Sequence, residues 1–360
     1  MKNIIVVCPF GIGDVLFTTP FIAALKEEAP DIRISYIGNA RTFPVLKNDP
    51  RLHKVFSYER DEFFAVYKKS PWAFLRKWQG FITDIRREKF DAAFDFSLGS
   101  PLGLALMLAG VPLRIGYDYK GRGRWLTQKI PLKGFEGRPV AGYYLELLKY
   151  WKADHHKSGR AGAPPGMALF PSESDRNWAR DFLAQNSLSD KKFLCLYPGG
   201  GASWGKGAHQ KRWPAGQYAK LADKIIEKTS LALILMGDKS EIELCETVKN
   251  AMRGPKAINA AGKTSVLQAA ALVCHARCVV ANDGGPLHVA VASGVPTASI
   301  FGPVDSVVYG PFPAKGHKVI IKGLSCQPCY RRFRMTDCQH LSCLKELSVE
   351  EVFNQVEVLL

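Results

Sequence analysis

The sequence predicts an α/β protein of two doubly wound domains that face a central cleft. Three observations support this prediction: the chain has 360 residues, short β-branched runs alternate with helical segments, and glycine-rich turns follow three of these runs. One hydrophobic core rarely organises more than about 250–300 residues, so a chain of this length indicates two domains. Alternating strands and helices predict parallel sheets, which bind ligands at the carboxyl ends of their strands.

The first half of the chain alternates strand and helix patterns. Its elements are expected at residues 3–7, 18–28, 33–37 and 92–96. Around residues 154–165 the pattern gives way to His, Gly, Ala and Pro, which is typical of a linker. We therefore expect an N-terminal domain over residues 1–160.

The second half restarts the same alternation. Strands are expected at residues 193–197, 231–236, 278–281 and 297–301, with helices at residues 217–227 and 265–275. This pattern predicts a second domain over residues 161–345. Ser348 is followed three residues later by Glu351, a capping box that predicts a C-terminal helical segment over residues 346–360.

The charge of the chain predicts an anionic partner. It carries 49 Lys and Arg against 33 Asp and Glu, a net charge of +16, which suits nucleic acid, anionic lipid or a phosphorylated substrate. No apolar run approaches the roughly 18 residues that span a bilayer, and no signal-peptide core is present. Nine cysteines without an export signal indicate reduced thiols, so we expect a cytoplasmic protein.

Residues 58–90 mix many aromatic side chains with Lys and Arg. This mixture suits an anionic membrane surface, because aromatic side chains enter the headgroup layer and basic side chains contact anionic lipid. An amphipathic helix that packs on its own domain and exposes a basic face has the same pattern. The sequence leaves both interpretations open.

The first glycine turn presents an acidic residue at the end of a strand. Gly11-x-Gly13 resembles a dinucleotide fingerprint, but Leu16 stands where a small residue is needed, and Gly38-Asn39 replaces the acidic residue expected after the second strand. A nicotinamide or flavin cofactor is therefore disfavoured. The turn places Asp14 just before a helix, where it either caps the helix or performs chemistry at the mouth of the cleft.

The middle turn, residues 199–201, nearly fits a P-loop. However, Gly207 replaces the Ser or Thr that would bind magnesium, and the next helix opens at Pro214 instead of at a lysine. We expect a glycine-lined loop whose backbone amides bind an anion, with Lys206 or Lys211 adding positive charge. A flexible surface loop is the alternative.

The late turn has the strongest local signal. Asp283, Gly284 and Gly285 leave a strand, and the following Pro suits the first turn of a helix that runs to residue 293. Backbone amides of Gly284, Gly285 and Leu287 would then face a ligand phosphate. His288 lies one turn into this helix, where it either donates to the same phosphate or has a structural role.

Together, these segments resemble glycosyltransferase family 9, the lipopolysaccharide heptosyltransferases and their relatives. The matching segments are Gly13-Asp14-Val15 with Thr18, Thr19 and Pro20, Lys211-Arg212-Trp213-Pro214, Asp283-Gly284-Gly285-Pro286-Leu287-His288, and Phe301-Gly302-Pro303-Val304-Asp305. The resemblance spans nearly the whole chain. It implies the GT-B fold of two Rossmann-like domains, and transfer of a heptose from ADP-heptose to the lipopolysaccharide inner core at the cytoplasmic membrane face.

The resemblance also implies roles for single residues. Asp14 occupies the position of the general base, Lys211 that of a lysine that contacts the donor diphosphate, and Glu241 that of a carboxylate that binds the nucleotide ribose. The family's donor-binding turn corresponds to Asp283, Gly284, Gly285 and His288, with Leu287 beside them. Hydroxyl residues common in these loops are glycines here, which leaves Ser203 as a side-chain donor to the diphosphate.

These parts predict inverting transfer. The carboxylate takes a proton from the acceptor hydroxyl, which attacks the anomeric carbon opposite the departing diphosphate. No paired-carboxylate D-x-D motif is evident, so we expect no metal and no cofactor besides the nucleotide sugar. The expected partners are that donor, a phosphorylated lipid or lipopolysaccharide-core acceptor and, peripherally, the anionic inner-membrane surface.

Two further classes of function remain as alternatives. Another nucleotide-sugar enzyme of the same architecture, such as a different sugar transferase or a 2-epimerase, would share the donor turns. A basic nucleic-acid-binding protein would share the charge, but nothing in the sequence resembles an RNA-binding module, so we expect no nucleic-acid partner.

The C-terminal region contains four closely spaced cysteines, Cys326, Cys329, Cys338 and Cys343. The first pair has C-x-x-C spacing, which is compatible with zinc, but the second pair lacks the close spacing of a zinc ribbon. A structural metal, reduced thiols and a redox-sensitive pair all remain open.

Overall fold

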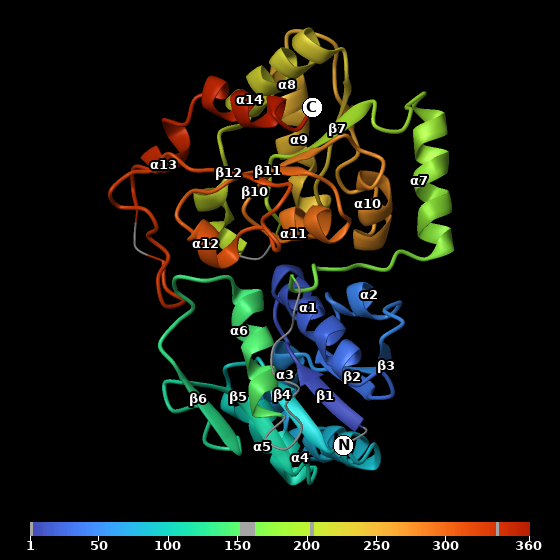
Figure 1. Cartoon of the computed structure of the whole chain (residues 1–360), viewed down its shortest axis with the longest axis vertical. Coiled ribbons are helices and arrows are strands. Elements are labelled where there is room, and N and C mark those ends of the chain that lie inside the picture. Colours follow the sequence, from blue (N-terminus) through green and yellow to red (C-terminus); the bar gives the residue numbers. More distant parts are fainter. Residues whose placement is uncertain (1–2, 152–162, 202–204, 336–337) are drawn as a thin grey trace. The chain divides into compact units, whose positions relative to one another are not determined.

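The chain forms two compact units in a computed structural model that describes all residues except 1–2, 152–162, 202–204 and 336–337 (Figure 1). Unit 1 comprises Met1–Phe135 and Val140–Pro165, and unit 2 comprises Glu136–Pro139 and Gly166–Leu360. Most of the expected linker, residues 154–165, lies outside the described residues.

Unit 1 is built on a six-stranded parallel sheet with the order β3-β2-β1-β4-β5-β6. Its strands are β1 Asn3–Val7, β2 Arg33–Gly38, β3 Leu52–Ser57, β4 Ala92–Asp95, β5 Leu113–Tyr119 and β6 Gln128–Leu132. The strand order reverses between β1 and β4, so the topological switch point lies there. Every residue of both strands is buried, as is usual for central strands of a parallel sheet.

The helices of unit 1 include one that begins earlier than the sequence predicts. They are α1 Ile12–Glu28, α2 Phe43–Leu46, α3 Arg60–Lys69, α4 Pro71–Arg87, α5 Ser100–Leu108 and α6 Val140–Glu146, followed by the 3-10 helix η1 Leu147–Tyr150. The expectation of a helix start at residue 18 was wrong by more than a turn. Helix α1 is buried on nearly all sides between Val15 and Leu25, so its N-terminal half has no polar face to reveal helical periodicity.

Unit 2 repeats the plan with a second six-stranded parallel sheet, in the order β12-β11-β10-β7-β8-β9. Its strands are β7 Phe193–Tyr197, β8 Ala232–Leu235, β9 Ile258–Asn259, β10 Val279–Asn282, β11 Thr297–Ile300 and β12 Lys318–Ile320. Here the switch point lies between β7 and β10. The two glycine turns of the second half follow these two strands.

Helices surround this second sheet and include the predicted C-terminal helix. They are α7 Glu173–Gln185, η2 Gly205–Lys211, α8 Ala215–Thr229, η3 Lys239–Glu241, α9 Ile242–Ala251, α10 Val266–Val273, α11 Gly285–Ala292, α12 Ser306–Tyr309, α13 Ser342–Lys345 and α14 Val349–Glu357. The capping box is confirmed: the Ser348 amide donates to Glu351 Oε2 at 2.8 Å, and the Glu351 amide donates to Ser348 Oγ at 3.2 Å. Helix α14 packs on α8, β11 and β12, so it is part of unit 2.

Within the described ranges, none of the helices has both the length and the apolar character that a membrane crossing requires.

Candidate functional site

The two glycine turns of unit 2 meet at its switch point, where Asn282 joins them. β7 and β10 pair in parallel, so the turns that follow them lie at the same edge of the sheet. The Asn282 side chain is completely buried, and its Nδ2 donates to the carbonyl of Pro198 at 2.8 Å. Its Oδ1 accepts from the Trp213 amide at 3.1 Å. Asn282 therefore ties both turns to the Lys-Arg-Trp-Pro segment, a role that the sequence did not reveal.

Close backbone packing explains why these turns contain glycine where a hydroxyl residue was expected. A Cβ at Gly284 would lie 2.0 Å from the carbonyl oxygen of Gly200, and the φ of Gly284 is +156°. A Cβ at Gly199 would lie 1.8 Å from Glu241 Oε1. Neither position has space for a side chain, so backbone groups have to supply the polar contacts there.

Glu241 lies beneath the glycine turn and organises it. The carboxylate is buried, with Oε1 accepting from the Gly201 amide at 2.9 Å and Oε2 accepting from the Asp238 amide at 3.1 Å. Burial raises the pKa of Glu241, while these amides and Arg212, 3.5 Å away, oppose the shift. The carboxylate thereby orients the glycine turn.

Lys211 and Asp283 form an ion pair that joins the end of η2 to the late turn. Lys211 Nζ lies 2.6 Å from Asp283 Oδ2, and both side chains are nearly buried. The pair lies beside the N-terminus of α11, where backbone amides favour an anion. Both residues were expected at the donor turn from sequence, and the structure brings them together.

His288 is buried on the first turns of α11, next to this ion pair. Burial is the largest cause that lowers the pKa of His288 to about 4; Lys211 lowers it further, and Asp283 opposes. The imidazole is therefore neutral near pH 7, where it can still donate one hydrogen bond. Leu287, beside it, is also buried, so its contribution to an anion would come from its backbone.

The structure thus gathers most of the expected donor residues at the carboxyl ends of the strands of one sheet. Those residues are Lys211, Glu241, Asp283, Gly284, Gly285, Leu287 and His288. Ser203, the remaining one, lies outside the described residues.

In unit 1, Asp14 follows β1 and occupies the first turn of α1. Its Oδ2 accepts from the Gly11 amide at 3.2 Å, so the helix-capping role that the sequence left open is present. Gly11 has no side chain to return the bond, so only one of the two capping-box bonds can form. Asp14 is half-buried, and its loop borders the switch point between β1 and β4.

Asp95, the last residue of β4, lies on the other side of this switch point and was not identified from the sequence. Asp95 is paired in register with Val7 of β1, is 4% exposed, and its Oδ1 accepts from the Ser97 amide at 2.8 Å. Burial raises the pKa of Asp95 to about 6. Burial raises the pKa of the Cys8 thiol, and the negative charges of Asp14 and Asp95 raise it further. Both carboxylates therefore lie near this thiol.

A signal for Asp95 was present in the sequence. It follows the buried apolar run Ala92-Ala93-Phe94 and precedes a glycine-containing loop, and Asp283 likewise lies between a buried strand and a glycine turn in unit 2. The expected strand at residues 92–96 hid this likeness, because it placed Asp95 inside the strand, whereas β4 ends at that residue.

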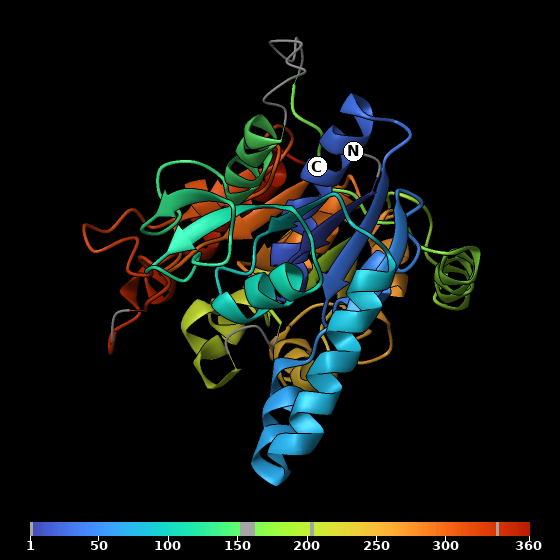
Figure 2. The ribbon, with the colours of Figure 1, turned by 90° about the horizontal axis from the view of Figure 1, so that it is seen from below.

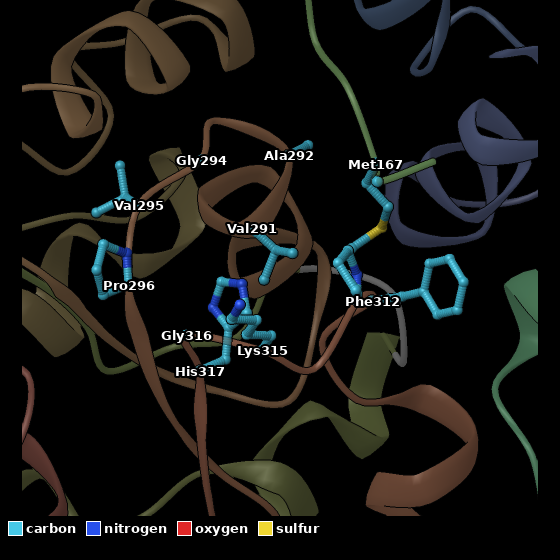
Figure 3. A pocket seen from close by; sticks show the side chains of 12 residues that line it. Met167, Val291, Ala292, Gly294, Val295, Pro296, Phe312, Lys315, Gly316 and His317 are labelled. Carbon is cyan, nitrogen blue, oxygen red and sulfur yellow. The ribbon is translucent and has the colours of Figure 1, made fainter. Parts of the chain in front are cut away.

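A separate pocket of about 320 Å³ lies at the amino ends of the strands of the unit 2 sheet (Figure 3). Met167, Val291, Phe312 and His317 are among its lining residues, and His317 Nδ1 lies 2.9 Å from Thr297 Oγ1. Thr297 begins β11, so the pocket is at the amino ends of the strands. It is not part of the site formed by the two glycine turns.

The C-terminal cysteines lie close enough to affect one another. Burial, followed by the neighbouring Cys329, Cys338 and Cys326, raises the pKa of Cys343 to about 11, and Cys329 Sγ donates to the Cys326 carbonyl at 3.1 Å. Among the residues that the structure describes, no set of three or more His, Cys, Asp or Glu side chains is arranged to hold a metal ion. Metal analysis of purified protein tests the zinc alternative directly.

Two doubly wound parallel units, with glycine turns at the switch point of the second, are the architecture of GT-B glycosyltransferases. Residues 78–340 match the sequence profile of glycosyltransferase family 9 (heptosyltransferase). The chain is also 31% identical over 357 residues to lipooligosaccharide heptosyltransferase 2 of Campylobacter jejuni. The alignment covers 98% of this chain and 96% of the relative. This chain belongs to glycosyltransferase family 9, and it is a glycosyltransferase.

Solved structures confirm the predicted fold. The glycosyltransferase family 9 protein of Veillonella parvula matches with a TM-score of 0.80 at 22% identity, covering 99% of this chain and 97% of that one. ADP-heptose lipopolysaccharide heptosyltransferase II of E. coli matches with a TM-score of 0.74 at 22% identity, covering 100% and 98%.

Proposed function

We propose that this enzyme transfers a heptose from ADP-heptose to the inner core of lipopolysaccharide, with inversion at the anomeric carbon and without a metal. The observation that carries the proposal is the cluster at the switch point of unit 2, where the Lys211–Asp283 pair lies at the N-terminus of α11. The names of the relatives support heptose as the sugar, since the C. jejuni relative is a lipooligosaccharide heptosyltransferase.

Unit 2 binds the donor in this proposal. The diphosphate lies against the amides of Gly284, Gly285 and Leu287, with the Lys211 ammonium beside it. His288 donates one hydrogen bond from its neutral ring. Ser203 remains a proposed side-chain donor, and Glu241 acts mainly by holding the glycine turn, with the nucleotide ribose next to it.

Unit 1 binds the acceptor and supplies the base. Asp14 accepts the proton of the attacking hydroxyl, and Asp95, at the end of the neighbouring strand β4, hydrogen-bonds the acceptor sugar. Parallel α/β sheets bind ligands at their switch points. Asp14 and Asp95 lie on the two sides of the switch point of unit 1.

The chemical step forms a bond from the acceptor oxygen to the anomeric carbon and breaks the bond from that carbon to the diphosphate. The proton of the acceptor goes to Asp14, and the bonding electrons leave with the diphosphate as the transition state gains oxocarbenium character. Lys211 and the helix N-terminus stabilise the developing negative charge. Attack opposite the leaving group inverts the configuration at the anomeric carbon.

The proposed location is the cytoplasmic face of the inner membrane, with peripheral contact to anionic lipid. An acceptor carried by a lipid anchor restricts the reaction to a bilayer surface, and a net charge of +16 favours an anionic one.

A nucleotide screen followed by a transfer assay tests the proposal. We expect ADP, but neither UDP nor GDP, to raise the melting temperature. ADP-heptose should then release ADP only when a lipopolysaccharide-core acceptor is present, and excess chelator should leave the rate unchanged. Stabilisation by UDP alone, or nucleotide release without acceptor, would refute the heptosyl assignment, and loss of activity in chelator would refute the metal-independent mechanism.

A further inference from the structure

We propose that the tip of the α3–α4 hairpin, residues 64–76, is the element with which this protein docks on an anionic lipid bilayer. The inference rests on the proposed function only for the need to reach a bilayer. The hairpin belongs to unit 1, where the two helices run side by side and their shared end extends beyond the strands of the unit 1 sheet (Figure 2).

Aromatic contacts join the two helices along their length. The ring centroids of Phe63 and Trp78 lie 5.4 Å apart, as do those of Tyr67 and Phe74, and Phe74 stacks on Trp78 at 6.3 Å. These rings continue the hydrophobic core of unit 1 outward. Packing of the helices on their own domain, one of the two interpretations of this segment, therefore explains the inner row of aromatic side chains. The hairpin projects from the domain as one packed element.

Four apolar side chains at the tip remain more than half exposed, although Tyr67 among them also contacts Phe74. The exposed side chains are Phe64, Tyr67, Trp72 and Leu75, at 56%, 52%, 78% and 53%. Trp72 and Leu75 are three residues apart on α4, so they share one face of that helix. A cluster of exposed aromatic and aliphatic side chains on one projection is typical of an interaction surface.

The charges of the tip select an anionic partner. Residues 64–76 contain Lys68, Lys69 and Arg76 and no acidic residue. Over the ranges that the structure describes, no carboxylate lies within ion-pair distance of these three cations, whereas Lys77, nearer the base, pairs with Glu62 at 2.9 Å. Lys68 Nζ lies 4.8 Å from the centre of the Phe64 ring, so a cation and an apolar side chain are presented together.

This combination fits a lipid surface better than a second copy of the chain. Two identical tips would bring like charges together, which opposes dimerisation through them. The last six residues of α3 and the first six of α4 each rise about 9 Å, which matches the roughly 5–10 Å to which interfacial helices enter the headgroup layer.

Vesicle co-sedimentation of the full-length protein tests the proposal. Vesicles of phosphatidylcholine with phosphatidylglycerol are compared with vesicles of phosphatidylcholine alone, and neither contains lipopolysaccharide. We expect the wild type to bind the anionic vesicles and to be released by salt. Lys68→Gln with Lys69→Gln and Arg76→Gln should weaken binding roughly a hundredfold, since each cation contributes about 1 kcal/mol near such a surface.

The apolar contribution is tested with Trp72→Ser combined with Leu75→Ser. The matched control is Val307→Ser with Val358→Ser, which removes two exposed apolar side chains from unit 2, 57% and 64% exposed. The tip variant should lose vesicle binding, the control should keep it, and both should bind ADP and unfold like the wild type.

Two results would overturn the docking proposal: unchanged vesicle binding by the tip variants, or a tip-dependent change in oligomeric mass without any vesicle binding. Because vesicle binding requires neither donor nor acceptor, these failures differ from a failure of the proposed transferase function, which would appear in the nucleotide screen.

Discussion

The Glu241 carboxylate lies against Gly199 so closely that a Cβ at position 199 would sit 1.8 Å from Oε1. Glu241 also accepts from the Gly201 amide at 2.9 Å, so the carboxylate fills the space where the glycine turn has no side chains. The donor loop and the carboxylate beneath it are therefore one packed unit, and a change in either should displace the other.

Replacing Gly199 with Ala tests this packing. The methyl group must displace a buried carboxylate, so we expect a loss of about 1–3 kcal/mol in the free energy of unfolding and a matching loss of ADP affinity. Gly216→Ala is the control, because a Cβ there meets nothing within 4 Å. Urea unfolding and calorimetric titration with ADP measure both effects. Equal behaviour of the two variants would contradict the packing argument.

Two substitutions separate the capping and catalytic roles of Asp14. Asn keeps an oxygen that can accept from the Gly11 amide but is no base, so Asp14→Asn should fold normally, bind ADP normally and lose about 10²–10⁴-fold in kcat. Asp14→Ala should lose the same activity and, in addition, about 1 kcal/mol of stability. Initial rates and thermal unfolding compare them. A near-normal rate for Asp14→Asn removes Asp14 as the base.

The Lys211–Asp283 pair makes different predictions for stability and for binding. Lys211→Met leaves a buried carboxylate unpaired, which should cost about 3–5 kcal/mol. Adding Asp283→Asn to it should restore most of that stability but not the affinity for ADP, because the cation is still missing. Urea denaturation and ADP titration follow the two quantities. Recovery of ADP binding in the double variant would show that Lys211 does not contact the diphosphate.

His288 should make the fold sensitive to acid. Its pKa is about 4 in the folded chain against an ordinary 6.5, so the unfolded chain takes up a proton first as the pH falls. The wild type should therefore lose up to about 3 kcal/mol between pH 6.5 and pH 4, relative to His288→Gln. Urea unfolding across this range compares the two proteins. Parallel stability profiles would mean that the imidazole is not held neutral.

Asp95 should affect the acceptor and not the donor. Asp95→Asn should raise the KM for the acceptor while leaving the ADP affinity unchanged, and it should keep the hydrogen bond from the Ser97 amide. Burial raises the pKa of Asp95 to about 6, so the folded chain holds its proton more tightly, and the wild type loses stability as the pH rises from about 4 through 6. Asn lacks this titration, so Asp95→Asn should be at least as stable at pH 7.5. Steady-state kinetics with each substrate varied checks the assignment, and a weaker affinity for ADP alone would contradict it.

Most of the parallel architecture could be predicted from the chain because its central strands are short, buried and mostly apolar. β1 and β7 have the predicted bounds, and the Ser348 capping box begins the last helix as expected. Five strands were missed. Four are edge strands: β3 and β6 are largely exposed, and β9 and β12 have only two and three residues, so none has a strong hydrophobic pattern. The fifth, β5, is an inner strand that is only partly buried at its start.

By itself, the sequence determined the fold class, the family resemblance and the glycine turns, because these depend on local patterns and on the order of motifs along the chain. Tertiary structure decided which side chains fill the space around those turns. Asn282 bonds to Pro198 and Trp213, Glu241 packs against Gly199, and Asp95 lies beside the Asp14 loop. These contacts join residues far apart in the chain, and the pairing of β1 with β4 and of β7 with both β10 and β8 brings them together.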